Sequence, residues 1–413
     1  MNEQLVVKNF GPIKDATVDF KRVTVFIGPT GGGKSTLAKL AAIFRNGALN
    51  TFGLKKRKKF FDDFSLEKSF NDATRFTWRY DDKQFTLLSD LNFDNGKSTK
   101  PSGNISPTTE SQSSTKITLS QENIRNSVEE LLKNLYGPSD ASNDLDSIQN
   151  ALNNSISKLL TEGVITTTYF TSNRVFIPSV EYSWAGLLRD DIGLPKDILD
   201  FANAFSVSRK DVHELDIPFL NVKYLHSDGK DFIKIPESET LFRLYETASG
   251  IQSVTPLLVL LEHLSRNTEQ AQSFIIEEPE LNLYPTAQRD LVYTLLEKCT
   301  QGENDLTITT HSPYVLSALN LALYANKVAT LFPYQHKKVA KLIPEKYWLK
   351  AEEFSAYFVA KGGATSIFDS KTGLLSESQL DEVSGEFADV FDRLTDLRVP
   401  EKKAVAKVKP VKK

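Results

Sequence analysis

The chain has 413 residues, of which 40% are hydrophobic and 25% charged, and its formal net charge is −3 at pH 7. These values are ordinary for a globular protein with one large core and an inserted or appended region. They argue against a protein that coats nucleic acid over its whole surface. The single cysteine, Cys299, excludes an intramolecular disulfide and fits a reducing compartment, and we expect it to be a packed helix residue.

No stretch of the sequence is typical of export or of a membrane span. The first ten residues, MNEQLVVKNF, lack the basic start and the long apolar run of a signal peptide. The most apolar long stretch, Tyr314–Leu331, is interrupted by three polar residues, Asn320, Asn326 and Lys327. We interpret that stretch as a buried helix followed by a strand. We therefore expect a cytoplasmic protein without a membrane partner.

The N-terminal segment, residues 4–27, predicts three short strands joined by turns, one of them at Gly11-Pro12. The third strand leads into GPTGGGKS (28–35), and residues 36–46 continue as an Ala-rich helix. This is G-x-x-x-x-G-K-S between a strand and a helix, the context that the phosphate-binding loop requires.

The residue types of this loop explain what it binds. Glycines let the backbone turn its N–H groups around a phosphate, and the following helix N-terminus favours negative charge. Lys34 is expected to reach the β- and γ-phosphates, and the Ser35 hydroxyl to hold Mg²⁺. The sequence therefore predicts a nucleoside triphosphate site formed by Gly28, Pro29, Thr30, Gly31, Gly32, Gly33, Lys34, Ser35 and Thr36.

Residues 51–163 are predicted to be inserted into a core made of residues 1–50 and 164–345. The insertion begins with the basic run Lys55–Lys59, which is more often a solvated face than a nucleic-acid contact, although both remain open. A hairpin over 76–88 turns near Asp81-Asp82. The Ser/Thr-rich residues 94–116 predict a flexible loop. Apolar residues at helical spacing then predict a helical hairpin over 121–136 and 143–161.

The second half of the chain returns to a sheet at VITTTYF (164–170). Residues 181–226 are predicted to be largely helical, with breaks at Gly193, Pro195 and Pro218. We expect residues 346–398 to form an α/β extension and residues 399–413 to form a basic, disordered tail.

Two apolar strands downstream of the phosphate loop end in ionisable residues. FIIEEPE (274–280) places Glu277 and Glu278 at the end of a strand, where one carboxylate holds the Mg²⁺ shell and the next orients and deprotonates water. By position we assign the metal role to Glu277 and the base to Glu278. LTITTHSP (306–313) ends a second strand with His311, which is well placed to sense a γ-phosphate or an attacking water.

A third segment, ETASGIQS (246–253), leads into the apolar helix VTPLLVLLEHL. By itself Ser249-Gly250 at a helix start is an N-cap. The segment precedes the carboxylate strand, which is the position of the signature motif in ATP-binding-cassette (ABC) ATPases.

The ordered set GPTGGGKST, TASGIQS, FIIEEPELNLYP and TTHSPY resembles the OLD-type and ABC-type AAA ATPases, which are relatives of SMC and recombination-repair head domains. The resemblance implies an α/β fold, a P-loop NTPase of the ABC-ATPase head type with a mixed sheet flanked by helices and a helical insertion. It also implies a Mg²⁺-dependent ATPase whose heads dimerise on ATP. In such a dimer Ser249 and Gly250 reach the γ-phosphate held by the partner's Lys34, and Gln252 belongs to the same nucleotide-binding segment.

The segment TTTYFTSNRVFIPS (166–179) resembles the place where other ABC proteins carry a glutamine. Here Ser172, Asn173 and Arg174 stand in that loop. No Asp-x-Asp pair follows His311, so we interpret the chain as an ATPase without its own nuclease.

Three functions fit these motifs. The leading hypothesis is an ATPase switch of a bacterial anti-phage system of the Septu, retron-associated or PARIS type, controlling a separate effector such as a nuclease. The alternative is a DNA-repair or DNA-structure-sensing ATPase that uses Lys55–Lys59 and the basic tail. A third, an ABC transporter subunit, lacks the usual glutamine loop.

Overall fold

The computed structural model describes residues 3–45, 54–80, 83–88, 166–183, 194–236, 238, 240–266, 270–376, 390 and 394. The chain forms two compact units, Met1–Leu91 with Ile165–Lys413 and Asn92–Val164. The second unit lies wholly outside the described residues, and so do the loop expected at 94–116, the helices expected at 121–136 and 143–161, and the tail at 399–413. All elements of the described residues belong to the first unit.

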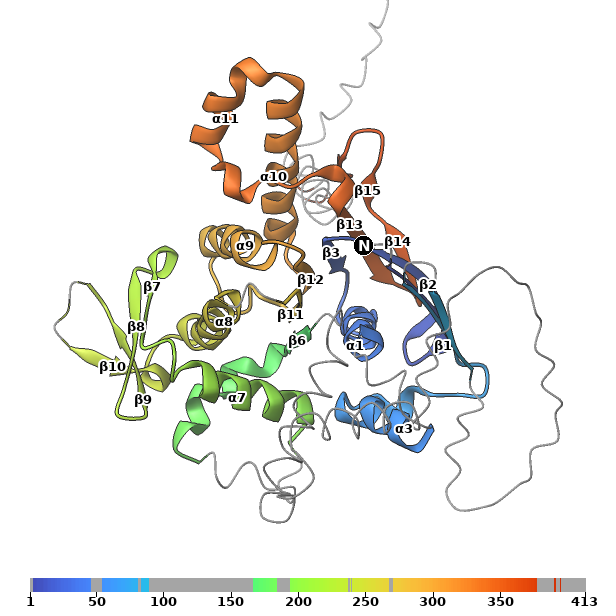
Figure 1. Ribbon diagram of the computed structural model, residues 1–413, viewed down its shortest axis with the longest axis horizontal. Helices are drawn as coiled ribbons and strands as arrows, with labels where there is room; N and C mark the ends of the chain where they lie inside the picture. Colours follow the sequence, from blue (N-terminus) through green and yellow to red (C-terminus); the bar gives the residue numbers. More distant parts are fainter. Residues whose placement is uncertain are drawn as a thin grey trace, which may run out of the picture. The chain divides into compact units, whose positions relative to one another are not determined.

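A six-stranded mixed sheet forms the centre of the fold (Figure 1). Its strand order is β14-β13-β3-β12-β11-β6, and neighbouring strands are parallel except that β14 runs antiparallel to β13. The central strands are continuous buried runs, as expected for strands covered on both faces. The strands are β3 (Val23–Ile27), β6 (Thr166–Phe170), β11 (Gln272–Glu277), β12 (Asp305–Thr310), β13 (Phe354–Ala360) and β14 (Gly363–Ser366).

Helices cover both sides of this sheet (Figure 1). On one side α1 contacts β6, β11 and β12. On the other side α9 contacts β11 and β12, and α8 and α10 pack against α9. The helices around the sheet are α1 (Lys34–Arg45), α7 (Lys196–Ser208), α8 (Ser249–Ser265), α9 (Pro285–Cys299) and α10 (Pro313–Leu331). A mixed sheet with a phosphate loop and helices on both faces is the predicted fold class.

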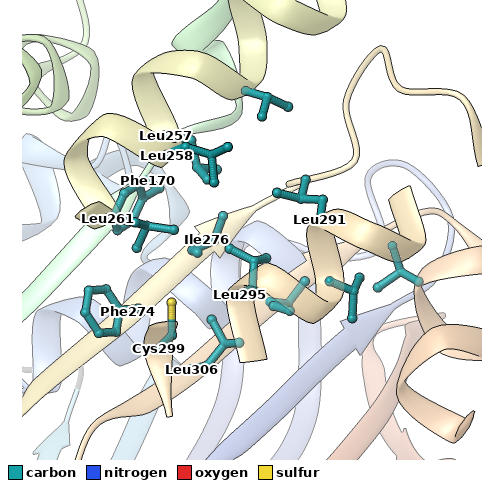
Figure 2. Packing of buried hydrophobic residues seen from close by; sticks show 14 of the residues in the cluster. Phe170, Leu257, Leu258, Leu261, Phe274, Ile276, Leu291, Leu295, Cys299 and Leu306 are labelled. Atoms are coloured by element: carbon teal, nitrogen blue, oxygen red, sulfur yellow. The ribbon is translucent and has the colours of Figure 1, made fainter. Parts of the chain in front are cut away.

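The core between α8, α9 and the sheet is close-packed and apolar. Figure 2 shows Leu257 and Leu261 of α8 and Leu295 of α9 near Ile276 of β11, and these side chains are at most 1% exposed. Cys299 is fully buried in the same cluster, as expected for a packed helix residue, and burial raises the pKa of its thiol. A thiol held in this way is inert.

A second, antiparallel sheet has the order β2-β1-β4-β5. Its strands are β1 (Glu3–Phe10), β2 (Ile13–Phe20), β4 (Arg75–Tyr80) and β5 (Lys83–Leu88), so the three N-terminal strands and the hairpin over 76–88 are confirmed. Because β4 pairs with β1, the hairpin belongs to the N-terminal sheet and not to the insertion. Lys55–Lys59 lie in α3 (Leu54–Asp63).

The far end of α1 is fixed by a buried ionic group. The guanidinium of Arg45 donates from Nε to Glu3 Oε2 at 2.8 Å, and from Nη1 to Asp305 Oδ1 at 2.8 Å and to Ser273 Oγ at 2.6 Å. Burial raises the pKa of both carboxyl groups, and the adjacent arginine opposes that shift. This group joins β1, α1, β11 and β12 at the strand ends opposite to the phosphate loop.

The prediction of a largely helical segment over 181–226 is wrong. Of this stretch, the described residues contain the helix α7 and then two strands of a third sheet of order β10-β9-β8-β7. Val222 and Tyr224 are buried while Lys223 between them is half-buried, an alternation that is typical of a strand. The strands are β7 (Glu214–Ile217), β8 (Val222–Ser227), β9 (Lys230–Lys234) and β10 (Leu241–Arg243).

Two expectations for the C-terminal third also need correction. The stretch Tyr314–Leu331 lies entirely within α10, and a 3₁₀ turn and α11 (His336–Leu342) follow it instead of a strand. Residues expected to form an extension after 345 include β13, which pairs with β3 and so completes the central sheet. In the described part of the chain no single helix is long and apolar enough to cross a membrane. The bent pair of helices Pro313–Leu331 and Pro333–Leu342 has the length and the apolar composition of a membrane span when the two are taken together.

Short elements connect the rest. They are η1 (Glu67–Ser69), η2 (Ser172–Phe176), η3 (Pro178–Ser183), η5 (Pro218–Leu220), η6 (Leu244–Glu246), η7 (Pro333–Gln335), η8 (Glu345–Tyr347), η9 (Ala351–Glu353), β15 (Phe368–Asp369) and β16 (Leu374–Leu375).

The packing of α9 gives a first prediction. Leu295→Ala removes a fully buried side chain from the core and should lower the free energy of unfolding by about 2–5 kcal/mol. Leu342→Ala, at a side chain that is 83% exposed, is the matched control and should change stability by less than about 0.5 kcal/mol. Urea unfolding followed by circular dichroism measures both, and equal effects of the two changes would contradict this packing.

Candidate active site

The phosphate loop connects the end of β3 to the start of α1 and is shaped by β13. A Cβ atom at Gly28 would lie 2.3 Å from the carbonyl oxygen of Val359, and one at Gly32 would lie 2.4 Å from the same oxygen. Gly28 also has φ +149°, a conformation that favours glycine. The loop therefore needs glycine at both positions because the backbone of β13 lies against it, while Pro29, Thr30 and Gly31 remain exposed.

Lys34, the first residue of α1, is buried. Its Nζ donates to the carbonyl oxygens of Gly28 at 2.9 Å and Pro29 at 3.0 Å. Burial lowers the pKa of Lys34, and the nearby carboxylates of Glu278, Glu280 and Glu277 oppose that shift. On the first turn of α1, Ser35 is exposed and Thr36 half-buried. The helix start thus presents one positive charge and an exposed hydroxyl beside the loop.

Glu277, the last residue of β11, is 4% exposed. Its Oε2 accepts from the Ser172 backbone N at 3.3 Å and from the Ser172 hydroxyl at 3.4 Å, while its Oε1 is buried without a hydrogen-bond partner among the described residues. Burial and the adjacent Glu277 carboxylate raise the pKa of Tyr169 well above its usual value. One carboxylate oxygen is thus left available beside the phosphate loop.

Glu278 and His311 face each other across the ends of β11 and β12. Glu278 Oε1 lies 3.3 Å from His311 Nε2, and His311 Nδ1 lies 3.5 Å from Lys34 Nζ. Both side chains are partly open to solvent, at 27% for Glu278 and 34% for His311. The backbone of Glu278 is left-handed, with φ +42°, and its N–H donates to the Thr309 carbonyl at 2.8 Å. Three residues predicted from separate motifs therefore form one continuous group.

Glu280, the last carboxylate of the same motif, was not predicted as a site residue. Its Oε1 accepts from the Thr310 hydroxyl at 2.5 Å and from the His311 backbone N at 3.0 Å. Its Oε2 has no hydrogen-bond partner in the described part of the chain, and burial raises the pKa of this carboxyl group. Glu280 fixes the end of β12 and with it the position of His311. Its position in the EEPE motif is the one sequence feature that could have indicated a role in the site.

The signature segment opens α8 (Ser249–Ser265). The helix N-cap is Ala248 rather than Ser249, which is exposed, and Gly250 is buried with no room for a Cβ beside the Asn282 carbonyl. Gln252 Nε2 donates to the Tyr245 and Thr247 carbonyls at 3.0 and 2.7 Å, so it holds the preceding turn. Within the described residues no hydrogen bond or ion pair joins this segment to Lys34 or Glu278.

The residues present fit a nucleotide with a divalent cation. The phosphate loop is a glycine cradle with a buried ammonium, and the unpartnered Glu277 Oε1 and the Ser35 hydroxyl offer the hard oxygen ligands that Mg²⁺ prefers. Among the described residues no group of three or more His, Cys, Asp or Glu side chains is placed to hold a metal ion. Magnesium is commonly held by one or two carboxylates together with substrate phosphates.

A comparison with known protein families assigns the chain that carries this site to a family. The chain matches the family described as AAA ATPase domain over residues 1–103 and 98–316, which is most of its length. The chain belongs to the AAA ATPase domain family. The AAA-type part of the resemblance is thereby confirmed at the level of the ATPase class, and no curated protein matches the chain in sequence.

Two solved structures similar to this AAA ATPase domain protein are SMC heads. The SMC head domain from Thermotoga maritima is 12% identical, with a TM-score of 0.35, and the match covers 89% of this chain and 98% of that chain. The Smc head domain from Pyrococcus furiosus, bound to the C-terminal domain of ScpA, is 11% identical, with a TM-score of 0.37 and coverage of 93% and 98%.

The contact between the phosphate loop and β13 gives a second prediction. Gly32→Ala forces a methyl group against the Val359 carbonyl, so the loop must shift and ATP affinity should fall about tenfold or more. Gly363→Ala is the matched control, since its Cβ would meet the Asp15 carbonyl at an ordinary 3.4 Å. Isothermal titration with a non-hydrolysable ATP analogue measures both affinities. Unchanged affinity in Gly32→Ala would show that this contact does not shape the loop.

Proposed function

We propose that this protein binds ATP with Mg²⁺ and hydrolyses it to ADP and phosphate. The observation that carries the proposal is the group formed by Lys34, His311 and Glu278, which come from three motifs. In this group the ring nitrogens of His311 lie within 3.5 Å of both the Lys34 ammonium and the Glu278 carboxylate. Membership of the AAA ATPase domain family supports the same activity.

Each residue has a separate part in the proposed reaction. When bound, Mg²⁺-ATP supplies the electrophilic γ-phosphoryl group and a cation that neutralises developing charge. The phosphate loop cradles the phosphates with its N–H groups, and the Lys34 ammonium exchanges the Gly28 and Pro29 carbonyls for phosphate oxygens. Ser35 and the Glu277 oxygen without a hydrogen-bond partner among the described residues would hold the cation.

Glu278 is the proposed general base. Its carboxylate is partly open to solvent and lies beside His311, which in turn lies beside Lys34, so a water can enter next to it. It takes the proton of the attacking water, and His311 orients that water or the γ-phosphate. Glu280 holds the His311 backbone in place during this step.

We also propose that the ATPase works as a dimer of heads. Ser249 is exposed at the start of a long helix, and it makes no contact with Lys34 in its own chain within the described residues. A helix start is suited to an anion. The phosphate that Ser249 and Gly250 would meet is then the one held by a second copy, as the resemblance to ABC-type ATPases implies, while Gln252 stabilises the turn before α8.

The cellular role that we propose is a switch in bacterial anti-phage defence, with nucleotide state controlling a separate effector such as a nuclease. The support is the sequence resemblance of the four motifs. The alternative, a DNA-repair or DNA-structure-sensing ATPase, rests on the basic run in α3, of which Lys59 is exposed. Co-purification with a nuclease favours the first role, and DNA-stimulated, salt-sensitive hydrolysis favours the second.

The carboxylate assignment gives a third prediction. Glu278→Gln keeps the side-chain shape but cannot accept a proton, so it should bind ATP normally and hydrolyse it about a hundredfold more slowly.

Lys34→Ala should weaken ATP binding tenfold or more, because a charge-assisted contact is worth roughly 1.5–3 kcal/mol. Phosphate release and ATP affinity are measured for both. Normal hydrolysis by Glu278→Gln together with loss in Glu277→Gln would reverse the two roles.

The proposed dimer gives a fourth prediction. Ser249→Arg should bind ATP but fail to hydrolyse it, since the larger side chain obstructs the phosphate held by the facing copy. Mixing Ser249→Arg with Lys34→Ala should restore part of the activity, because a mixed dimer contains one intact composite site. If subunit exchange is demonstrated and the mixture stays inactive, sedimentation of Glu278→Gln with and without ATP tests whether any dimer forms.

A further inference from the structure

Arg174, in the loop that resembles the glutamine loop of ABC proteins, is a buried cation bonded to the backbone. Its side chain is completely buried in η2, directly after the edge strand β6. Nε donates to the Ser253 carbonyl at 3.1 Å, Nη1 to the Thr171 and Glu277 carbonyls at 3.2 and 2.7 Å, and Nη2 to the Glu278 carbonyl at 2.6 Å. All four of these acceptors are backbone oxygens.

Keeping a guanidinium in such a place has an energetic cost. Burial lowers the pKa of Arg174 to about 10, and the carboxylates of Glu280, Glu277 and Glu278 oppose that shift, so the side chain remains charged at neutral pH. Buried cations are normally paired directly with a carboxylate. Here the charge compensates the carboxylates from a distance and leaves their side-chain oxygens available for a cation and for water.

The two shortest of these hydrogen bonds hold the carbonyls of Glu277 and Glu278, which belong to the two peptide groups on either side of the Glu278 Cα. Glu278 has a left-handed backbone, which is strained for a non-glycine residue and persists only where the surroundings impose it. Its N–H is held by the Thr309 carbonyl and its own carbonyl by Arg174. This conformation is the one in which the Glu278 carboxylate lies 3.3 Å from His311.

The same guanidinium also reaches α8. Its Nε contact is the carbonyl of Ser253, which lies one helical turn after Ser249. Arg174 therefore joins three segments: the loop after β6, the start of α8 and the end of β11. A displacement of the start of α8 changes the acceptor set of Arg174 and, through it, the backbone of Glu278.

We propose that Arg174 is a positioning residue of the ATPase, which sets the Glu278 carboxylate by holding the backbone of β11 and which couples that carboxylate to the start of α8. The proposal rests on the proposed function, because it concerns the efficiency of the same hydrolysis. Arg174 acts through Glu278, because its side chain is completely buried and donates to backbone carbonyls. It should therefore govern kcat and leave ATP affinity nearly unchanged.

The test compares Arg174→Lys and Arg174→Ala with the wild-type protein and with Arg209→Lys as the matched control. Arg209 is also a nearly buried arginine, but it pairs with Asp231 in the third sheet, at 2.6 Å. An ammonium cannot hold all four carbonyls of the Arg174 site, so Arg174→Lys should lose about tenfold or more in kcat, with Kd for an ATP analogue within about threefold of wild type. Arg209→Lys should keep kcat.

Rescue separates positioning from general structural damage. In Arg174→Ala, free guanidinium chloride at non-denaturing concentration should restore part of kcat, whereas sodium chloride at equal ionic strength should not. A wild-type kcat in Arg174→Lys overturns the inference and leaves the proposed ATPase intact. The inference is also overturned if the loss of kcat in the variants equals their loss of folded protein and guanidinium does not restore it. Absence of hydrolysis in the wild type overturns both.

Discussion

The site depends on parallel pairing in the central sheet, because parallel strands bring their carboxyl ends to one edge. Ile27 pairs with Thr310, and Thr309 pairs with Glu277, so β3, β12 and β11 end at nearly the same level. The phosphate loop, His311 and the carboxylates each lie at or directly after one of these ends. Lys34 and His311 meet for this reason, and the loop after β6 joins them at the same edge.

The site also concentrates opposite charges that are kept from neutralising one another completely. Three glutamates lie close to Lys34 and Arg174, yet the two cations make their short hydrogen bonds to backbone carbonyls. Glu277 and Glu280 each use one oxygen and leave the other without a hydrogen-bond partner among the described residues. An arrangement of this kind has a high electrostatic cost by itself, and the cation and polyphosphate of the proposed ligand would relieve it.

Those parts of the fold and site that have a local pattern were predicted from the sequence. The phosphate loop and the strands ending at Glu277 and His311 are apolar runs followed directly by functional residues, so a short window contains the whole signal. No local sequence pattern predicts the contact of Gly28 and Gly32 with β13, because Val359 lies far from both glycines in the sequence. The strands β7 and β8 are short, and the alternation of their buried and exposed residues was obscured by the neighbouring helix-like residues. No role was predicted for Arg174, which differed only from the residue that related proteins carry in this loop.

The buried group around Arg45 bears on how the chain folds as it is synthesised. Glu3 and Arg45 emerge early, but Ser273 and Asp305 belong to strands made more than two hundred residues later. Contacts of such long sequence separation form slowly and leave apolar surface exposed until they close. During translation α1 therefore lacks β11 and β12, the later strands that it packs against, and the Arg45 charge stays unpaired from Asp305 until those strands leave the ribosome.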